Sequence, residues 1–174
     1  MMKTKEILSA MKILSWIIFI GLCIKLGVIL FSSIMSLFVN KEAAENLYLG
    51  LDLSNLYDFS INHYISILSL LISITALKAY LFYLVIKIFS KINFDKPFTK
   101  VVTRLISSIS YISLWTGLLA YFANGYGKWV LKKGAEFRID WGSSEFLFMA
   151  GIVFVIALIF KRGVEIQSEN ELTV

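Results

Sequence analysis

The chain has 174 residues, of which 58% are hydrophobic and only 17% charged, with a formal net charge of +5. A soluble domain is about 45–50% apolar and about 25% charged, so this composition favours a protein that lies in lipid. The single proline and single cysteine exclude a collagen-like repeat and a disulfide-stapled scaffold. The basic residues flank apolar runs, where positive charge orients membrane helices, and we therefore expect no direct binding to nucleic acid.

Four apolar runs divide the chain, and a membrane-spanning helix needs about 20 such residues. The runs cover residues 13–39, 64–89, 101–123 and 146–160, and the flanking residues extend the last run to a span of about 144–161. They predict one membrane domain over residues 1–174, an all-α integral membrane protein built as an antiparallel four-helix bundle with a tail at 162–174. The first run is too long for a secretory signal, so we interpret it as an uncleaved signal anchor.

Basic residues between the runs predict the orientation, because cytoplasmic loops carry the excess of Lys and Arg. With the N-terminus inside, ten basic residues fall on the inner side and five on the outer side. We therefore expect both termini to be cytoplasmic, although four of the five outer residues lie in the second outer loop. The inner residues are Lys3, Lys5, Lys12, Lys87, Lys91, Lys96, Lys100, Arg104, Lys161 and Arg162, and the outer ones are Lys41, Lys128, Lys132, Lys133 and Arg138.

The connections between the runs differ in length. The joint at residues 91–100 is short and contains Pro97, which ends the preceding helix and makes the second and third helices antiparallel neighbours. The two outer connections, about 40–63 and 124–144, are long enough to carry structure. Residues 129–131 and 137–141 flank a turn-like segment, and residues 47–53 partly alternate in polarity. These patterns predict a small extracytoplasmic β cap.

Lys25 is the charged residue placed deepest in an apolar run, and charge in hydrocarbon must find a partner. At 100° per residue, Lys25 shares one face of the first helix with Ser32 and Ser36. One interpretation is a ligand-binding or lipid-binding site formed by these three residues. The other is a lysine that is held by hydroxyls and carbonyls or extends its stem to the lipid phosphates.

Lys78 lies in the second run, about opposite a stripe formed by Ser66, Ser69 and Ser73. If the serines face the bundle, Lys78 faces lipid. No Asp or Glu lies inside the apolar runs, so we expect neither lysine to have an acidic partner. This argues against a proton relay or a cation transporter, which need buried carboxylates.

The residues available for catalysis are few. His63 is the only histidine and Cys23 the only cysteine. A zinc site needs three or four protein ligands, so we expect no metal and no cofactor. Ser32 lies seven residues from Lys25, about 10 Å along a helix, which is too far for a serine–lysine pair. No nucleophile elbow or phosphate-binding loop is present, and we expect no enzyme activity.

Two segments resemble a known family. The joint Phe94-Asp-Lys-Pro-Phe98, followed by Arg104-Leu-Ile, and the tail from Ile159 to Val174 are similar to the bacterial membrane proteins grouped as domain of unknown function 2975. The joint residues carried by this resemblance are Pro97, Phe98 and Arg104. The resemblance implies a four-helix protein of the bacterial inner membrane, with no catalytic residues and often encoded beside a helix-turn-helix regulator.

The leading hypothesis is a non-enzymatic regulatory or sensory membrane protein that works with such a regulator and contacts membrane lipid. A homo-oligomer is a further expectation. The alternative is a transporter or channel component that handles an anion or a lipid headgroup near Lys25. The acidic tail, with Gly163 expected to end the last helix, is either solvated or docked on a basic surface.

Overall fold

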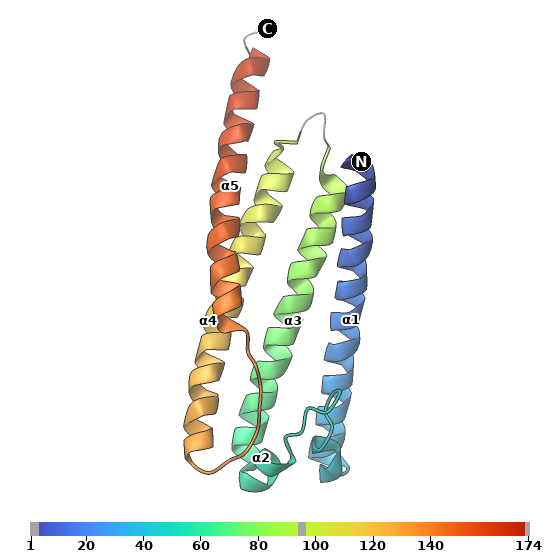
Figure 1. The fold of residues 1–174 in the computed structure, drawn as a ribbon, viewed down its shortest axis with the longest axis vertical. Helices are drawn as coiled ribbons and strands as arrows, with labels where there is room; N and C mark the ends of the chain where they lie inside the picture. Colours follow the sequence, from blue (N-terminus) through green and yellow to red (C-terminus); the bar gives the residue numbers. More distant parts are fainter. Residues whose placement is uncertain (1–3, 94–96, 173–174) are drawn as a thin grey trace.

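The computed structural model describes residues 4–93 and 97–172, and Figure 1 shows their arrangement. The elements are α1 (Thr4–Phe38), the 3₁₀ helix η1 (Lys41–Ala44), α2 (Ser54–Phe59), α3 (Ile61–Lys91), α4 (Lys100–Lys132) and α5 (Ser143–Leu172). The all-α prediction is confirmed within this part of the chain. Three joint residues, Phe94, Asp95 and Lys96, lie outside the described residues, as does the end of the tail.

Four helices are long and apolar enough to cross a membrane: Glu6–Phe38, Ile61–Lys91, Lys100–Lys132 and Ser143–Glu169. Consecutive long helices run in opposite directions, and their backbones pack in the order α1, α3, α4, α5 (Figure 1). Side chains of α5 also reach α3. We call the end with the α3–α4 joint the joint end, and the end with η1 and α2 the loop end. The start of α1 and the end of α5 both lie at the joint end.

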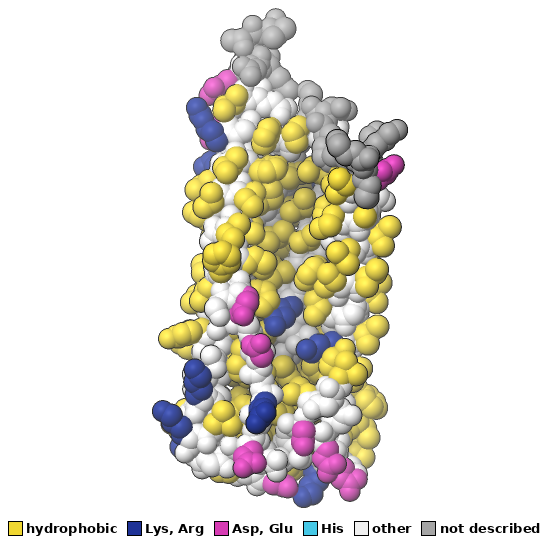
Figure 2. All heavy atoms as spheres, in the orientation of Figure 1, with side chains coloured by type: hydrophobic (Ala, Val, Ile, Leu, Met, Phe, Trp, Pro, Cys, Tyr) yellow, Lys and Arg dark blue, Asp and Glu magenta, His cyan; other side chains and the backbone are white. Residues whose placement is uncertain are grey.

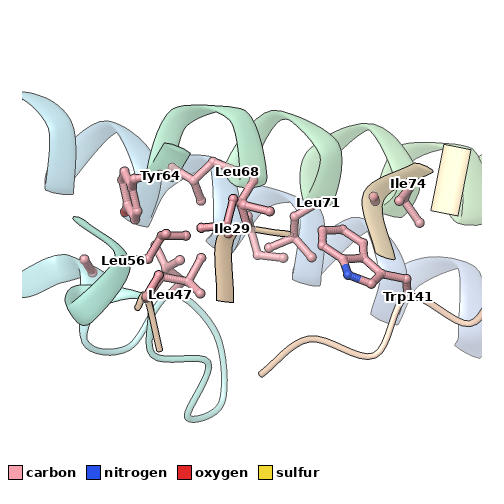
Figure 3. Close-up of a cluster of buried hydrophobic side chains, with 14 of the residues drawn as sticks. Ile29, Leu47, Leu56, Tyr64, Leu68, Leu71, Ile74 and Trp141 are labelled. Carbon is pink, nitrogen blue, oxygen red and sulfur yellow. The ribbon is translucent and has the colours of Figure 1, made fainter. Parts of the chain in front are cut away.

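A cluster of buried apolar side chains holds the loop end together (Figure 3). Tyr64, Leu68 and Leu71 of α3 are buried against Ile29 of α1. The connection between α1 and α3 adds further buried leucines, including Leu56 of α2. At the loop end the helices and the connections therefore share one core. This packing holds the connections in place along the bundle.

The predicted β cap is wrong: the described residues contain no strand. The first predicted strand, residues 129–131, continues α4, and residues 133–142 form an extended linker. Its side chains do alternate, because Ala135 and Trp141 are buried whereas Glu136, Arg138 and Asp140 are exposed. The alternation arises because the linker packs its apolar side against the helices, with no partner strand. Residues 47–53 form a turn, closed by a 2.9 Å bond from Leu47 N–H to the Leu51 carbonyl.

The last helix begins at Ser143, close to the expected start of its span, and ends later than expected. The linker turns back along the bundle, so α5 begins beside the middle of α4, where Leu147 packs on Gly117 (Figure 1). At the other end α5 does not stop at Gly163 but continues to Leu172. Much of the segment expected to be a separate tail is therefore the last part of a 30-residue helix.

The outward faces of the helices are strongly apolar. Phe31 on α1, Trp115 on α4 and Phe148 on α5 are each 66% or more exposed. Figure 2 shows hydrophobic side chains over most of one face, with charged side chains concentrated toward the loop end. A contiguous exposed apolar surface of this kind is what contact with lipid requires.

Candidate functional site

Four charged side chains gather partway along the bundle. Lys25 comes from α1, Lys78 from α3, Asp140 from the linker and Glu145 from the first turn of α5. Lys25, Asp140 and Glu145 are the charged groups that act electrostatically on Lys78. Figure 2 shows acidic and basic side chains next to one another at this height, with a mainly hydrophobic surface above them. We call these four residues the charged cluster.

Lys25 is half-buried and lies against an aromatic ring. Its Nζ atom is 5.4 Å from the centroid of the Tyr48 ring, within cation–π range. Tyr48 is placed by a tight turn in which Leu49 and Gly50 have positive φ angles of 44° and 84°. The Asn46 side chain supports this turn by accepting a 2.9 Å hydrogen bond from the Gly50 N–H. The partner of Lys25 therefore comes from a connection and not from its own helix.

The condition for placing Lys78 toward lipid, a serine stripe that faces the bundle, is not met, because Ser69 and Ser73 are exposed. Lys78 is half-buried, and its Nζ atom lies 5.0 Å from the centroid of the Phe146 ring on α5. Asp140 and Glu145 also act electrostatically on Lys78, although neither residue forms an ion pair with it. The linker carries Asp140, which lies in the expected outer loop, and leads into the first turn of α5, which carries Glu145.

The two carboxylates also have a local structural role. Asp140 Oδ1 accepts a 3.0 Å hydrogen bond from the Gly142 N–H, and Gly142 has a φ of 65° that turns the chain into α5. Glu145 lies in the first turn of α5, where a negative charge stabilises the helix dipole. No ion pair within 4.0 Å joins the four members of the charged cluster, all of which are described. The charges of the cluster are therefore not paired directly.

The serines predicted to share a site with Lys25 have other surroundings. Ser36 is buried, and its hydroxyl lies 2.7 Å from the Tyr64 hydroxyl of α3. Ser36 also donates a 2.9 Å hydrogen bond to the Ser33 carbonyl. Ser32 is half-buried and lies two helical turns from Lys25 on the same helix. Ser36 thus links α1 to α3 at the loop end, while Lys25 is engaged by Tyr48.

The predicted joint residues lie at the opposite end of the bundle. Pro97 and Phe98 are half-buried, and Arg104 is exposed on the first turns of α4. The Phe98 ring meets the Phe160 ring at 5.2 Å in an edge-to-face contact, and it fills the space beside the hydrogen-only side chain of Gly163. The two segments on which the family resemblance rests therefore touch each other, through Phe98 on one side and Phe160 and Gly163 on the other.

Sequence reasoning gave no role to His63, which the structure places in an aromatic group at the loop end. Its Nδ1 atom lies 2.7 Å from the Tyr126 hydroxyl of α4, and its ring meets the Trp129 ring edge-to-face. These contacts join α3 to α4. Within residues 4–93 and 97–172, no group of three or more His, Cys, Asp or Glu side chains is arranged to hold a metal ion.

Four apolar helices, an apolar outer surface and a charged cluster partway along the bundle are compatible with a multi-pass membrane protein. Residues 62–174, most of the chain, match a family described as Protein of unknown function (DUF2975), and the protein belongs to this family. No curated protein and no solved structure matches the chain.

Proposed function

We propose that this protein is a non-enzymatic sensory or regulatory protein of the bacterial inner membrane that works with a cytoplasmic helix-turn-helix regulator. The observation that carries the proposal is the path of α5. This helix begins at the charged cluster, with Glu145 and Phe146, and runs without a break to the joint end, where it meets Phe98. In known protein switches, a local change in charge shifts the position of a structural element, and the shift alters a surface elsewhere in the protein. A helix that connects the charged cluster to the joint end could act in this way.

The signal in this proposal is a charged solute that binds at the charged cluster. Lys25 and Lys78 offer two ammonium groups held on aromatic faces, while Asp140 and Glu145 offer two carboxylates. A solute that neutralises the two lysines or the two carboxylates changes the electrostatic potential at the start of α5. Because α5 packs on α4 along its length, its displacement would be transmitted to the joint. The regulator then responds to the altered surface at the joint end.

Orientation is part of the proposal, since the regulator needs the joint end to face the cytoplasm. With Cys23 replaced by Ser, single cysteines at the exposed Asp52 and Glu136 should react with an impermeant thiol reagent on intact cells. Cysteines at the exposed Lys91 and Ser168 should react only after the cells are opened. Labelling of Lys91→Cys from outside would reverse the orientation and contradict a cytoplasmic partner.

Copurification tests the partnership. Wild-type protein in mild detergent should retain a small DNA-binding regulator, identified by mass spectrometry. Lys25→Gln with Lys78→Gln should change the retained amount by about fivefold or more, the lower range of typical allosteric coupling. The control, Lys12→Gln with Lys128→Gln, removes the same charge at exposed positions outside the cluster and should have no effect. Absence of a DNA-binding protein, or equal effects of both pairs, would contradict the proposal.

The charged cluster also favours a second function, a transporter or channel component that handles an anion or a lipid headgroup near Lys25. The supporting observation is that Lys25 acts electrostatically on Lys78 and that neither lysine forms an ion pair with a described carboxylate. Proteoliposomes loaded with chloride or phosphate distinguish the two functions. Flux that Lys25→Gln abolishes supports transport, whereas tight vesicles together with a copurifying regulator support sensing.

A further inference from the structure

A groove with a basic rim lies at the joint end, far along the bundle from the charged cluster. Its volume is about 390 Å³, and it runs between the start of α4 and the last third of α5. We call it the basic groove. Its lining residues are Lys100, Thr103, Arg104, Lys161, Val164 and Glu165.

The charge of the basic groove is strongly unbalanced. Lys100, Arg104 and Lys161 contribute three cationic groups from two helices. The one acidic lining residue, Glu165, is already engaged by Arg162, whose guanidinium donates a 2.9 Å hydrogen bond to Glu165 Oε2. The groove therefore presents a net positive surface that an anion would complement, and Arg and Lys are the residues that bind phosphate oxygens.

Thr103 lines the basic groove between Lys100 and Arg104. Thr103 Oγ1 is buried and has no hydrogen-bond partner, a state that only one other side-chain oxygen shares among the described residues, Ser113 Oγ. Most helical hydroxyls of this protein donate to a carbonyl one turn back; Ser107, for example, donates to the Thr103 carbonyl. The Thr103 oxygen is enclosed by protein atoms, so it belongs to the floor of the groove and not to the surface that a ligand contacts.

The location of the basic groove identifies the class of anion. Lys161 directly follows the apolar run 146–160 of α5, and Val101 beside Lys100 is 54% exposed. Leu158 and Ile159, one turn before the groove, are 51% and 59% exposed. A ligand here meets positive charge at the end of a lipid-facing apolar surface, which is the arrangement of a phospholipid: a phosphate above and an acyl chain below.

We propose that the basic groove binds one anionic phospholipid, with its phosphate held by Lys100, Arg104 and Lys161 and its acyl chain along α5. The site is separate from the charged cluster and does not depend on which side of the membrane the joint end faces. It places a bound lipid against the segment that contacts Phe98, so that α4 and α5 are held together at the joint end by a shared ligand.

The test uses the full chain in mild detergent with phosphatidylglycerol or phosphatidylcholine added, read by thermal unfolding and by native mass spectrometry. Phosphatidylglycerol should raise the melting temperature and remain bound, and phosphatidylcholine should not. Lys100→Gln, Arg104→Gln and Lys161→Gln combined should weaken phosphatidylglycerol binding on the order of 10- to 100-fold, given the typical attraction per basic residue near a lipid surface. The melting temperature in phosphatidylcholine should stay unchanged.

A matched variant controls for the loss of charge. Lys128→Gln, Lys132→Gln and Arg138→Gln remove three exposed basic residues at the loop end and should leave the phosphatidylglycerol effect intact. Equal loss in both triple variants would overturn the proposal, as would an equal stabilisation by inorganic phosphate, which would mark a free-anion site. If the first triple variant fails to fold, Lys161→Gln alone decides: an unchanged affinity for phosphatidylglycerol contradicts the site.

Discussion

Replacing Gly117 with Ala is expected to lower the free energy of unfolding by about 1–3 kcal/mol, the usual cost of overpacking. A Cβ atom at Gly117 would lie 2.8 Å from Leu147 Cγ and 3.0 Å from the Leu147 backbone N. The backbone atom cannot move away by a rotamer change, so the first turn of α5 would have to shift. The sign is opposite to the ordinary effect of Gly→Ala within a helix, a gain of about 0.5–1 kcal/mol.

Gly125 provides the control on the same helix. A Cβ atom there would meet nothing within 4 Å, so Gly125→Ala should stabilise the protein or leave it unchanged. Both variants are compared with wild type by chemical or thermal unfolding in one detergent. A stable Gly117→Ala variant would show that the start of α5 is free to move away from α4.

The Gly117 contact also matters for the charged cluster. It fixes the start of α5, the element that carries Glu145, which acts electrostatically on Lys78, and Phe146, whose ring centroid lies 5.0 Å from Lys78 Nζ. We therefore expect Gly117→Ala to weaken any solute binding at the charged cluster as well as the fold, whereas Gly125→Ala should affect neither.

The long helices could be predicted because each depends on the hydrophobicity of one continuous segment of sequence. An apolar run of about 20 residues has few stable states except a helix in lipid, and Pro97 marks the joint between two such runs. The prediction of antiparallel neighbours across this joint is confirmed by the packing of α3 on α4. Helix ends depend on tertiary contacts, which explains why α4 continues to Lys132 although its apolar run weakens after Ala123.

The charged cluster could not be predicted from periodicity within single helices. The sequence shows Lys25 and Lys78 as charged residues within apolar runs. Their aromatic partners, Tyr48 and Phe146, lie on other elements and cannot be found from the pattern of one helix. The alternation of apolar and polar residues over 135–141 indicates that one side of this segment is buried. It does not distinguish burial against a strand from burial against helices. The prediction of a strand places Asp140 in a cap outside the bundle. The same alternation is equally typical of a linker that lies along helices.

Gly163 shows a related ambiguity. A glycine after Lys161 and Arg162 fits a helix C-terminus, yet the same residue type is needed wherever another group approaches a helix closely. The structure favours the second role, because α5 continues and the Phe98 ring occupies the position that a side chain would take.

This second role predicts a specific coupling between Gly163 and Phe98. A Cβ atom at Gly163 would overlap the Phe98 ring, with the ring Cγ at 2.7 Å, so that Gly163→Ala should cost about 1–3 kcal/mol in the wild-type background. With Phe98→Ala the obstacle is gone. The same glycine replacement should then be neutral or gain about 0.5–1 kcal/mol, the value for an unobstructed helix position.

The four proteins of this double-mutant cycle are compared by unfolding in detergent, with Gly151→Ala as the control on α5, since a Cβ atom at Gly151 meets nothing within 4 Å. Additive effects of Gly163→Ala and Phe98→Ala would mean that the two residues do not share this space. A coupling of the expected size would establish that the joint and the last helix hold each other in place. The position of α5 at the joint end is then set by its contact with Phe98, which is the contact that a signal carried along α5 would have to move.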